Sequence, residues 1–113
     1  MERHLKKHLE DVRMAISDIE MVTDRFGKEY STFLNEILFR RCIEHEIIIV
    51  GNAIQNLLQI NPDIQISSAL KIIDAGKHTL HFYDDPKPGL LWDIITNDIP
   101  LVKQEVSQLL DKA

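Results

Sequence analysis

Apolar residues recur every three or four positions along most of this chain, and no segment alternates apolar and polar residues as a strand does. The first series predicts a helix over roughly residues 3–26, with one polar position inside it. Its members are Leu5, Leu9, Val12, Ile16, Ile19 and Phe26, with Thr23 in the gap. Gly27 follows directly and is suited to end this helix, because glycine tolerates a left-handed backbone.

A second helical series runs from about Lys28 to Ile60 and predicts one long helix with two apolar faces. The first face consists of Phe33, Leu34, Ile37 and Leu38. The second face consists of Phe39, Ile43, Ile47, Val50, Ile54 and Leu57. Such a helix is covered on more than one side, either by a second copy of the chain or by the other helices of its own chain. Gly51 in its second half indicates either a kink or a point of close packing.

Turn-forming residues divide the rest of the chain into shorter helices. Residues 61–63 (Asn-Pro-Asp) predict a turn, because proline fixes φ and its neighbours favour turns. Ser67 or Ser68 is then expected to cap a third helix. Gly76 lies inside that helix and weakens it, since an interior glycine costs about 1 kcal/mol relative to alanine.

The C-terminal part of the chain begins with a loop and continues with two helices. Residues 84–89 contain two prolines and predict the loop, because proline cannot take part in a regular hydrogen-bond ladder. A fourth helix begins at about Leu90 and is interrupted at Asn97 and Asp98. Asp98 is expected to cap the last helix, which carries Pro100 in its first turn.

Length and composition fit one domain that spans residues 1–113, an all-α up-and-down bundle of four or five helices. Cys42 is the only cysteine, which excludes an internal disulfide and a Cys-based zinc site. No apolar run approaches the roughly 20 residues that cross a bilayer, and no secretory signal is visible. We therefore expect a cytoplasmic protein without membrane contact. A net charge of −5 argues against binding nucleic acid through overall charge, and leaves a local basic cleft open.

Residues suited to chemistry gather at the end of the third helix. They are Lys77, His78, His81 and Tyr83. Histidine exchanges protons near neutral pH, and lysine can stabilise the charge that develops on a phosphate. Cleavage of RNA without a metal needs these two functions, a base for the 2′-hydroxyl and a cation for the phosphorane oxygens. The other interpretation of the cluster is a set of surface polar residues that flank a turn.

A metal site is a further alternative. His4 and His8 are four residues apart on the first helix, a spacing that can ligate a metal ion. His45 would have to join them in space, because local spacing offers no third ligand. Otherwise His4 and His8 belong to a solvated helix start, and His45 is a packed or paired histidine on the long helix.

The segment that holds the cluster resembles the HepT-like group of the HEPN superfamily. Members carry an Arg-x(4–6)-His motif extended by x-Tyr, then a Tyr-Asp loop, a Trp-x-Ile-Ile helix and an Asn-Asp-Leu-Pro segment. The corresponding runs here are residues 81–84 (His-Phe-Tyr-Asp) and 91–100 (Leu-Trp-Asp-Ile-Ile-Thr-Asn-Asp-Ile-Pro). Residues 48–53 (Ile-Ile-Val-Gly-Asn-Ala) are similar to the group's Ile-Ile-Gly-Glu-Ala segment, with Asn52 in place of Glu. The resemblance extends over essentially the whole chain.

The resemblance implies a HEPN-like helical bundle that forms a homodimer, with the His motifs of two protomers facing a shared cleft. It implies the toxin component of a toxin-antitoxin pair, an endoribonuclease that cleaves RNA without a metal or other cofactor. The implied antitoxin partner is a minimal nucleotidyltransferase (MNT), which silences such toxins by adenylylating the motif tyrosine. By position, His81 is the implied catalytic histidine and Tyr83 the implied modified residue.

The motif arginine has no counterpart in this chain. Its position falls at Gly76, or with longer spacers at Ala75 or Asp74, and none of these residues is basic. Lys77 can bring a positive charge near the phosphate, without the bidentate fork of arginine. Two interpretations therefore stay open. The chain is an endoribonuclease that uses His81 and Lys77, or a catalytically silent HEPN dimer that binds a nucleotidyltransferase.

Overall fold

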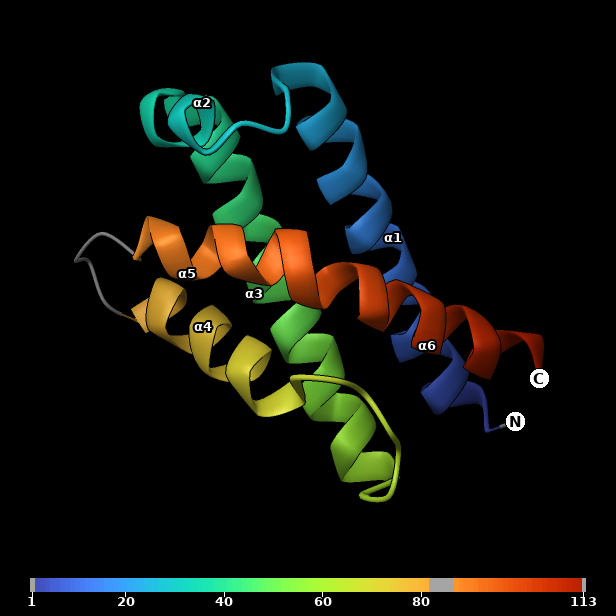
Figure 1. Cartoon of the computed structure of the whole chain (residues 1–113). Coiled ribbons are helices and arrows are strands. Elements are labelled where there is room, and N and C mark those ends of the chain that lie inside the picture. Colours follow the sequence, from blue (N-terminus) through green and yellow to red (C-terminus); the bar gives the residue numbers. More distant parts are fainter. Residues whose placement is uncertain (1, 82–86, 113) are drawn as a thin grey trace.

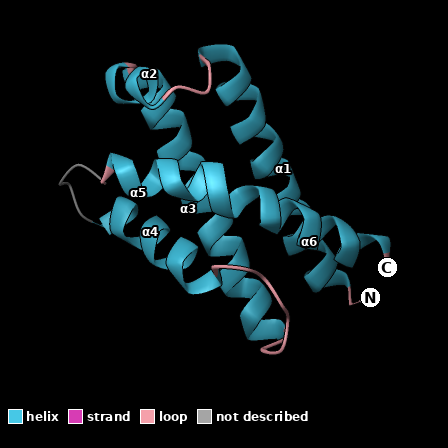
Figure 2. Cartoon of the chain, viewed as in Figure 1, coloured by secondary structure: helices cyan, strands magenta, loops and turns pink. Residues whose placement is uncertain are grey.

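The computed structural model describes residues 2–81 and 87–112, with the backbone alone for residues 80 and 81 (Figure 1). The elements are α1 (Arg3–Phe26), α2 (Tyr30–Asn35), α3 (Ile37–Ile60), α4 (Ala69–His81), α5 (Pro88–Asp93), the π-helical turn η1 (Ile94–Asp98) and α6 (Ile99–Asp111). Every regular element in these two ranges is helical, which confirms the all-α prediction (Figure 2). Because α5, η1 and α6 follow one another without a gap, they form one continuous rod.

Helix α1 has the predicted bounds and ends as predicted. The carboxylate of Glu2 accepts hydrogen bonds from the backbone N–H groups of His4 and Leu5, which caps the N-terminus. At the other end, Gly27 adopts φ 98° and its N–H donates to the Thr23 carbonyl. A positive φ is cheap only for glycine, so this residue stops the helix at a defined point.

Helix α3 is the centre of the bundle, because it packs against α1 on one side and α4 on the other (Figure 1). The second predicted apolar face is fully buried in these contacts: Phe39, Ile43, Ile47, Val50, Ile54 and Leu57. Coverage by the chain's own helices therefore accounts for this face. The first face is different, since only Phe33 is buried while Leu34, Ile37 and Leu38 are 36%, 49% and 65% exposed.

The prediction of one continuous helix over residues 28–60 is wrong, because the chain breaks at Glu36. This residue has an extended backbone, with φ −98° and ψ 102°, and separates α2 from α3. The break allows Phe33 and Phe39 to meet edge to face, with ring centroids 5.1 Å apart. On a continuous helix the two rings would be about 9 Å apart along the axis and on different faces. Trp92 of α5 packs against Phe33 at 5.2 Å and completes the aromatic cluster.

Helices α3 and α4 cross at two glycines that face each other's helix. A Cβ atom on Gly51 would lie 3.0 Å from the Ile72 carbonyl oxygen, and one on Gly76 would lie 3.1 Å from the Ile47 carbonyl oxygen. Of the two predictions for Gly51, close packing is the correct one. The expectation that Gly76 weakens the third helix is not met, because α4 runs through it and uses it for contact with α3.

Between α3 and α4 the predicted turn is present, since the Asn61 side-chain oxygen accepts a hydrogen bond from the Asp63 N–H. The Ser68 carbonyl accepts the first helical bond of α4, from Ile72. The two serine hydroxyls serve tertiary contacts, because Ser67 donates to Glu105 and Ser68 donates to Asp98. These bonds join the start of α4 to α6 and η1.

The C-terminal rod differs from the prediction in two places. Pro88, expected in a loop, begins α5, whereas residues 84–86 of that loop lie outside the described ranges. The interruption expected at residues 97 and 98 is a π-helical turn, in which the Ile99 N–H donates to the Ile94 carbonyl. Asp98 makes no side-chain cap for α6, so that prediction is wrong, while Pro100 does lie in the first turn of α6. The Asp98 carboxylate faces α4 instead, where a lysine and a serine bind it.

Candidate functional site

The predicted cluster at the end of α4 separates onto different faces of the helix. Lys77 is exposed and lines a cavity that α1, α3 and α4 enclose. His78 is exposed and lines a second cavity, between α4 and α5. His81 is the last residue of α4, one turn after Lys77, and its side chain lies outside the described part of the chain. Tyr83 also lies outside the described residues.

The cavity that contains Lys77 has a volume of about 720 Å³. This size is within the range of about 300–1,000 Å³ that is usual for small-molecule sites. Its apolar wall includes Met14, Ala15, Ile49 and Ile73. Asn52, which occupies the position of the Glu in the resembled segment, lies in the same cavity. We refer to this space as the α1–α3–α4 cavity.

Glu46 is the unusual residue of the α1–α3–α4 cavity. It lies on α3 and is 9% exposed, and no described group donates a hydrogen bond to its buried Oε2 atom. Asp18 of α1 lines the same cavity. Burial and then the negative charge of Asp18 raise the pKa of Glu46, while His45 opposes the shift. A proton on Glu46 can be shared with Asp18, which further favours the neutral form.

Replacement of Glu46 by glutamine is expected to stabilise the protein at pH 8. Because the pKa of Glu46 is raised on folding, ionisation opposes the folded state above the unfolded pKa, and the penalty disappears at lower pH. The melting temperature of Glu46→Gln should therefore exceed that of the unmodified protein at pH 8 and approach it near pH 4. Thermal melts across this pH range test the sign. A difference that is constant with pH would contradict it.

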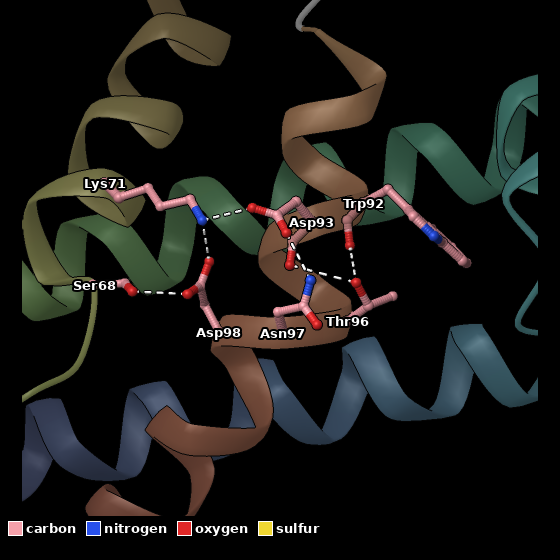
Figure 3. Close-up of polar contacts among 7 residues, drawn as sticks. All are labelled: Ser68, Lys71, Trp92, Asp93, Thr96, Asn97 and Asp98. Atoms are coloured by element: carbon pink, nitrogen blue, oxygen red, sulfur yellow. Dashed lines mark hydrogen bonds and ion pairs between the residues drawn. The ribbon is translucent and has the colours of Figure 1, made fainter.

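The second cavity has a volume of about 370 Å³ and a lining with more basic than acidic residues. Its charged or titratable members are Lys71, Asp74, His78 and Lys87, and its apolar members include Leu90 and Leu91. Lys71 is already engaged in the fold, because its ammonium donates to Asp93 at 2.7 Å and to Asp98 at 2.6 Å (Figure 3). The positive charge of Lys71 is therefore not available to a ligand in this cavity, although Lys71 lines it.

Lys71, Asp93, Asp98 and Ser68 form a polar network that ties α4 to the C-terminal rod (Figure 3). The Ser68 hydroxyl donates to the other Asp98 oxygen at 2.7 Å, so both oxygens of this carboxylate are used. The hydrogen bonds to Asp93 and Asp98 raise the pKa of Lys71, and Lys71 in turn lowers the pKa of Asp93. These shifts keep Lys71 and Asp93 ionised at neutral pH, and the hydrogen bonds of the network fix the start of α4 against η1.

Removal of the Asp98 carboxylate by Asp98→Ala is expected to lower the free energy of unfolding by about 2 kcal/mol, because two charge-assisted partners lose their acceptor. Asp93→Ala is the matched control. It should cost less, since the Asp93 side chain is 47% exposed and that of Asp98 only 11%. Urea denaturation of the two variants measures both values, and equal losses would contradict the assignment.

The metal-binding alternative is not supported within residues 2–81 and 87–112. No group of three or more His, Cys, Asp or Glu side chains there is arranged to hold a metal ion. His8 instead lies 3.8 Å from an Asp11 carboxylate oxygen on the same helix. His4 is exposed on α1, as a solvated helix start requires, whereas His45 is exposed on α3 and so does not occupy a packed position. No described helix combines the length and the apolar character needed to cross a membrane.

Comparison with known proteins gives no match to a family model, a curated protein or a solved structure. The site must therefore be interpreted from its own residues. Sequence reasoning missed Glu46, although a signal was present. Glu46 lies three residues after Ile43 and four residues before Val50. This spacing places its carboxylate on the same helix face as the buried apolar residues.

Proposed function

We propose that this chain is the toxin component of a toxin-antitoxin pair, a HepT-like endoribonuclease that cleaves RNA in the cytoplasm without a metal ion. In this proposal His81 takes the proton from the 2′-hydroxyl and Lys77 stabilises the charge on the phosphate. The observation that carries it is the position of Lys77, one helical turn before His81 and at the wall of a ligand-sized cavity. The all-helical bundle and the residues quoted for the resemblance give further support.

A second candidate is a catalytically silent HEPN dimer that binds a nucleotidyltransferase. One specific observation favours it. Gly76, where the motif arginine would fall with the shortest spacer, is buried against the backbone of α3 and has no room for a side chain. Lys71, another cation on α4, is bound by two carboxylates. Lys77 would then be a partner-binding residue rather than a catalytic one.

Incubation of the purified protein with single-stranded RNA in excess EDTA separates the two candidates. The endoribonuclease should cleave the RNA in the presence of the chelator, because the proposed mechanism uses side chains alone. Intact RNA at high concentrations of folded protein would refute the enzyme and leave the silent module. A mock preparation from cells without the gene controls for contaminating ribonucleases.

The proposed homodimer uses the apolar patch formed by Leu34, Ile37 and Leu38, which the chain's own helices leave exposed. We assign this patch to a second copy because it belongs to the first apolar face of the sequence, which the bundle does not bury. The double variant Ile37→Asp, Leu38→Asp should convert a dimer into a monomer, since it places charges in the buried centre of the interface. Light scattering after size-exclusion chromatography measures the mass. A Leu101→Asp variant, at an exposed leucine of α6, is the control and should remain dimeric.

The proposed antitoxin is a minimal nucleotidyltransferase that adenylylates Tyr83. Incubation of the two purified proteins with ATP should add one adenylyl group to the chain, with release of pyrophosphate, and none to Tyr83→Phe, because phenylalanine lacks the hydroxyl that attacks the α-phosphorus. Intact-mass spectrometry detects the addition. A small nucleotidyltransferase encoded by the adjacent gene would support the pairing and would be the first partner to use.

A further inference from the structure

We propose that the contact between Glu46 of α3 and Asp18 of α1 is a pH-sensitive switch, which holds the two helices together when the pair shares a proton. Loss of that proton leaves two carboxylates facing each other between α1 and α3 and weakens the contact of the helices. Three observations carry the proposal: the burial of Glu46, its position beside α1, and the lack of a described donor for its Oε2 atom. The proposal does not depend on ribonuclease activity.

The contact between Glu46 and Asp18 requires a proton. Glu46 is 9% exposed, and within the described residues no group donates to its buried Oε2 atom. Its side chain makes a hydrogen bond with Asp18. Two ionised carboxylates are acceptors only, so this hydrogen bond forms only when one of the two acids is protonated. Glu46 is the acid that holds the proton, because it is buried whereas Asp18 is exposed.

The other charged and titratable side chains around Glu46 do not replace this proton. They come from α1, α3 and α4 and line the two cavities to which Glu46 belongs: Lys7, His8, Asp11, Arg41, Cys42, His45 and Lys77. Lys7 and Arg41 are paired with acids of their own helices. His45 lowers the pKa of Glu46, but burial and Asp18 outweigh it. None of these side chains donates to the buried Oε2 atom.

The switch opens as the pH rises. Burial, and then the negative charge of Asp18, raise the pKa of Glu46 above its ordinary value of 4.5. The contact therefore has its full strength below the ordinary pKa and loses it as the pH passes through the raised pKa. Any opening of α1 that exposes Glu46 to water becomes about tenfold more favourable for each pH unit between the ordinary and the raised pKa.

The position of the pair links this switch to the α1–α3–α4 cavity, because Glu46 and Asp18 both line it. Met14 and Ala15 of α1 belong to the same lining. Movement of α1 away from α3 would therefore widen the space beside Lys77. The cavity should be narrow in acid and should open more often at higher pH.

A pH titration of the glutamate carboxyl carbons by ¹³C NMR tests the shared proton directly. The signal of Glu46 is assigned by its absence from Glu46→Gln, and its pKa should lie above the ordinary value of 4.5. Asp18→Asn should lower this pKa, because it removes a negative charge and supplies an amide donor to the ionised form. An ordinary pKa for Glu46, or one that Asp18→Asn leaves unchanged, would overturn the proposal.

Amide hydrogen exchange measures the opening itself. After correction for the intrinsic exchange rate, the protection of α1 amides around Asp18 should fall between about pH 5 and pH 8, by the factor that the measured pKa of Glu46 predicts. Glu46→Gln should keep these amides protected over the whole range, because its side-chain amide donates to Asp18 at every pH. Protection that is constant with pH in the unmodified protein would refute the switch.

Glu44→Gln is the matched control variant. It makes the same change on α3, at a residue that pairs with Arg41 and lines neither of the two cavities. This variant should lose protection with rising pH as the unmodified protein does. An equal loss of protection in Glu46→Gln would show that other groups cause the opening, and would refute the role of the pair.

Discussion

Replacement of Gly76 by arginine is expected to unfold the protein at temperatures where the unmodified chain is stable. This is expected even though the substitution creates an Arg-x4-His motif that ends at His81. A Cβ atom alone would lie 3.1 Å from the Ile47 carbonyl oxygen and 3.3 Å from the Ile48 Cα. Both contacts are with backbone, so they cannot be relieved by a change of rotamer. The longer side chain would also force a guanidinium into the contact between α3 and α4.

The expected loss for Gly76→Arg is about 3 kcal/mol or more, the upper range for overpacking combined with a buried charge. For a domain of this size such a loss lowers the melting temperature by roughly 15 °C. Circular dichroism at 222 nm during heating measures it. A melting temperature unchanged to within a few degrees would contradict the close crossing that the structure shows.

Asp74→Arg is the control, because it introduces the same residue into the same helix at an exposed position. It also gives the motif, with the longer spacer of six residues before His81. Positions seven apart share a helix face, so the new guanidinium would lie on the face of His81. We expect a normal melting temperature and faster RNA cleavage than in the unmodified protein. Slower cleavage by a folded variant would contradict the expectation that an arginine at this position supports catalysis by His81.

Substitution of His81 by alanine is expected to reduce metal-independent RNA cleavage by at least about 100-fold, the usual contribution of a general acid or base. The variant should fold normally, because His81 is the last residue of α4. Initial rates on a fluorescent single-stranded RNA in EDTA provide the measurement.

His78→Ala is the appropriate comparison, since this histidine lies three residues earlier and lines the other cavity. It should retain most of the activity. If His78→Ala abolished cleavage and His81→Ala did not, the catalytic assignment would move to the α4–α5 cavity. Lys77→Ala should reduce the rate as well, because the proposal gives Lys77 the phosphate charge, whereas Lys77→Arg should preserve it.

Several elements of the fold were predictable because they depend on local chemistry. The bounds of α1 follow from its apolar spacing and from Gly27, and the turn at residues 61–63 follows from its side chains. The break at Glu36 was not predictable, because the residues around it are compatible with a helix. It occurs because Phe33 and Phe39 pack against each other and against the distant Trp92.

The candidate site was predictable only in part. The sequence predicted a cluster of chemically active residues at the end of α4, and Lys77 of this cluster does line a cavity. The sequence did not reveal that His78 and Lys77 line different cavities, because that depends on which helices pack on each side of α4. Glu46 was overlooked for a similar reason. A single carboxylate in an apolar series is visible, but its burial depends on α1 packing beside α3.

By itself, the sequence determined that this chain is helical, where its first helix ends and which residues form the two apolar faces of residues 28–60, because these properties follow from residue spacing along one helix. Only the tertiary structure decided which of the two faces is buried. Only the tertiary structure decided the role of the glycines and the state of Glu46. Gly51 and Gly76 permit a backbone approach of α3 and α4 that no local pattern encodes. That approach and the packing of α1 bring Glu46 and Lys77 to one cavity, since contacts between helices depend on how whole faces meet.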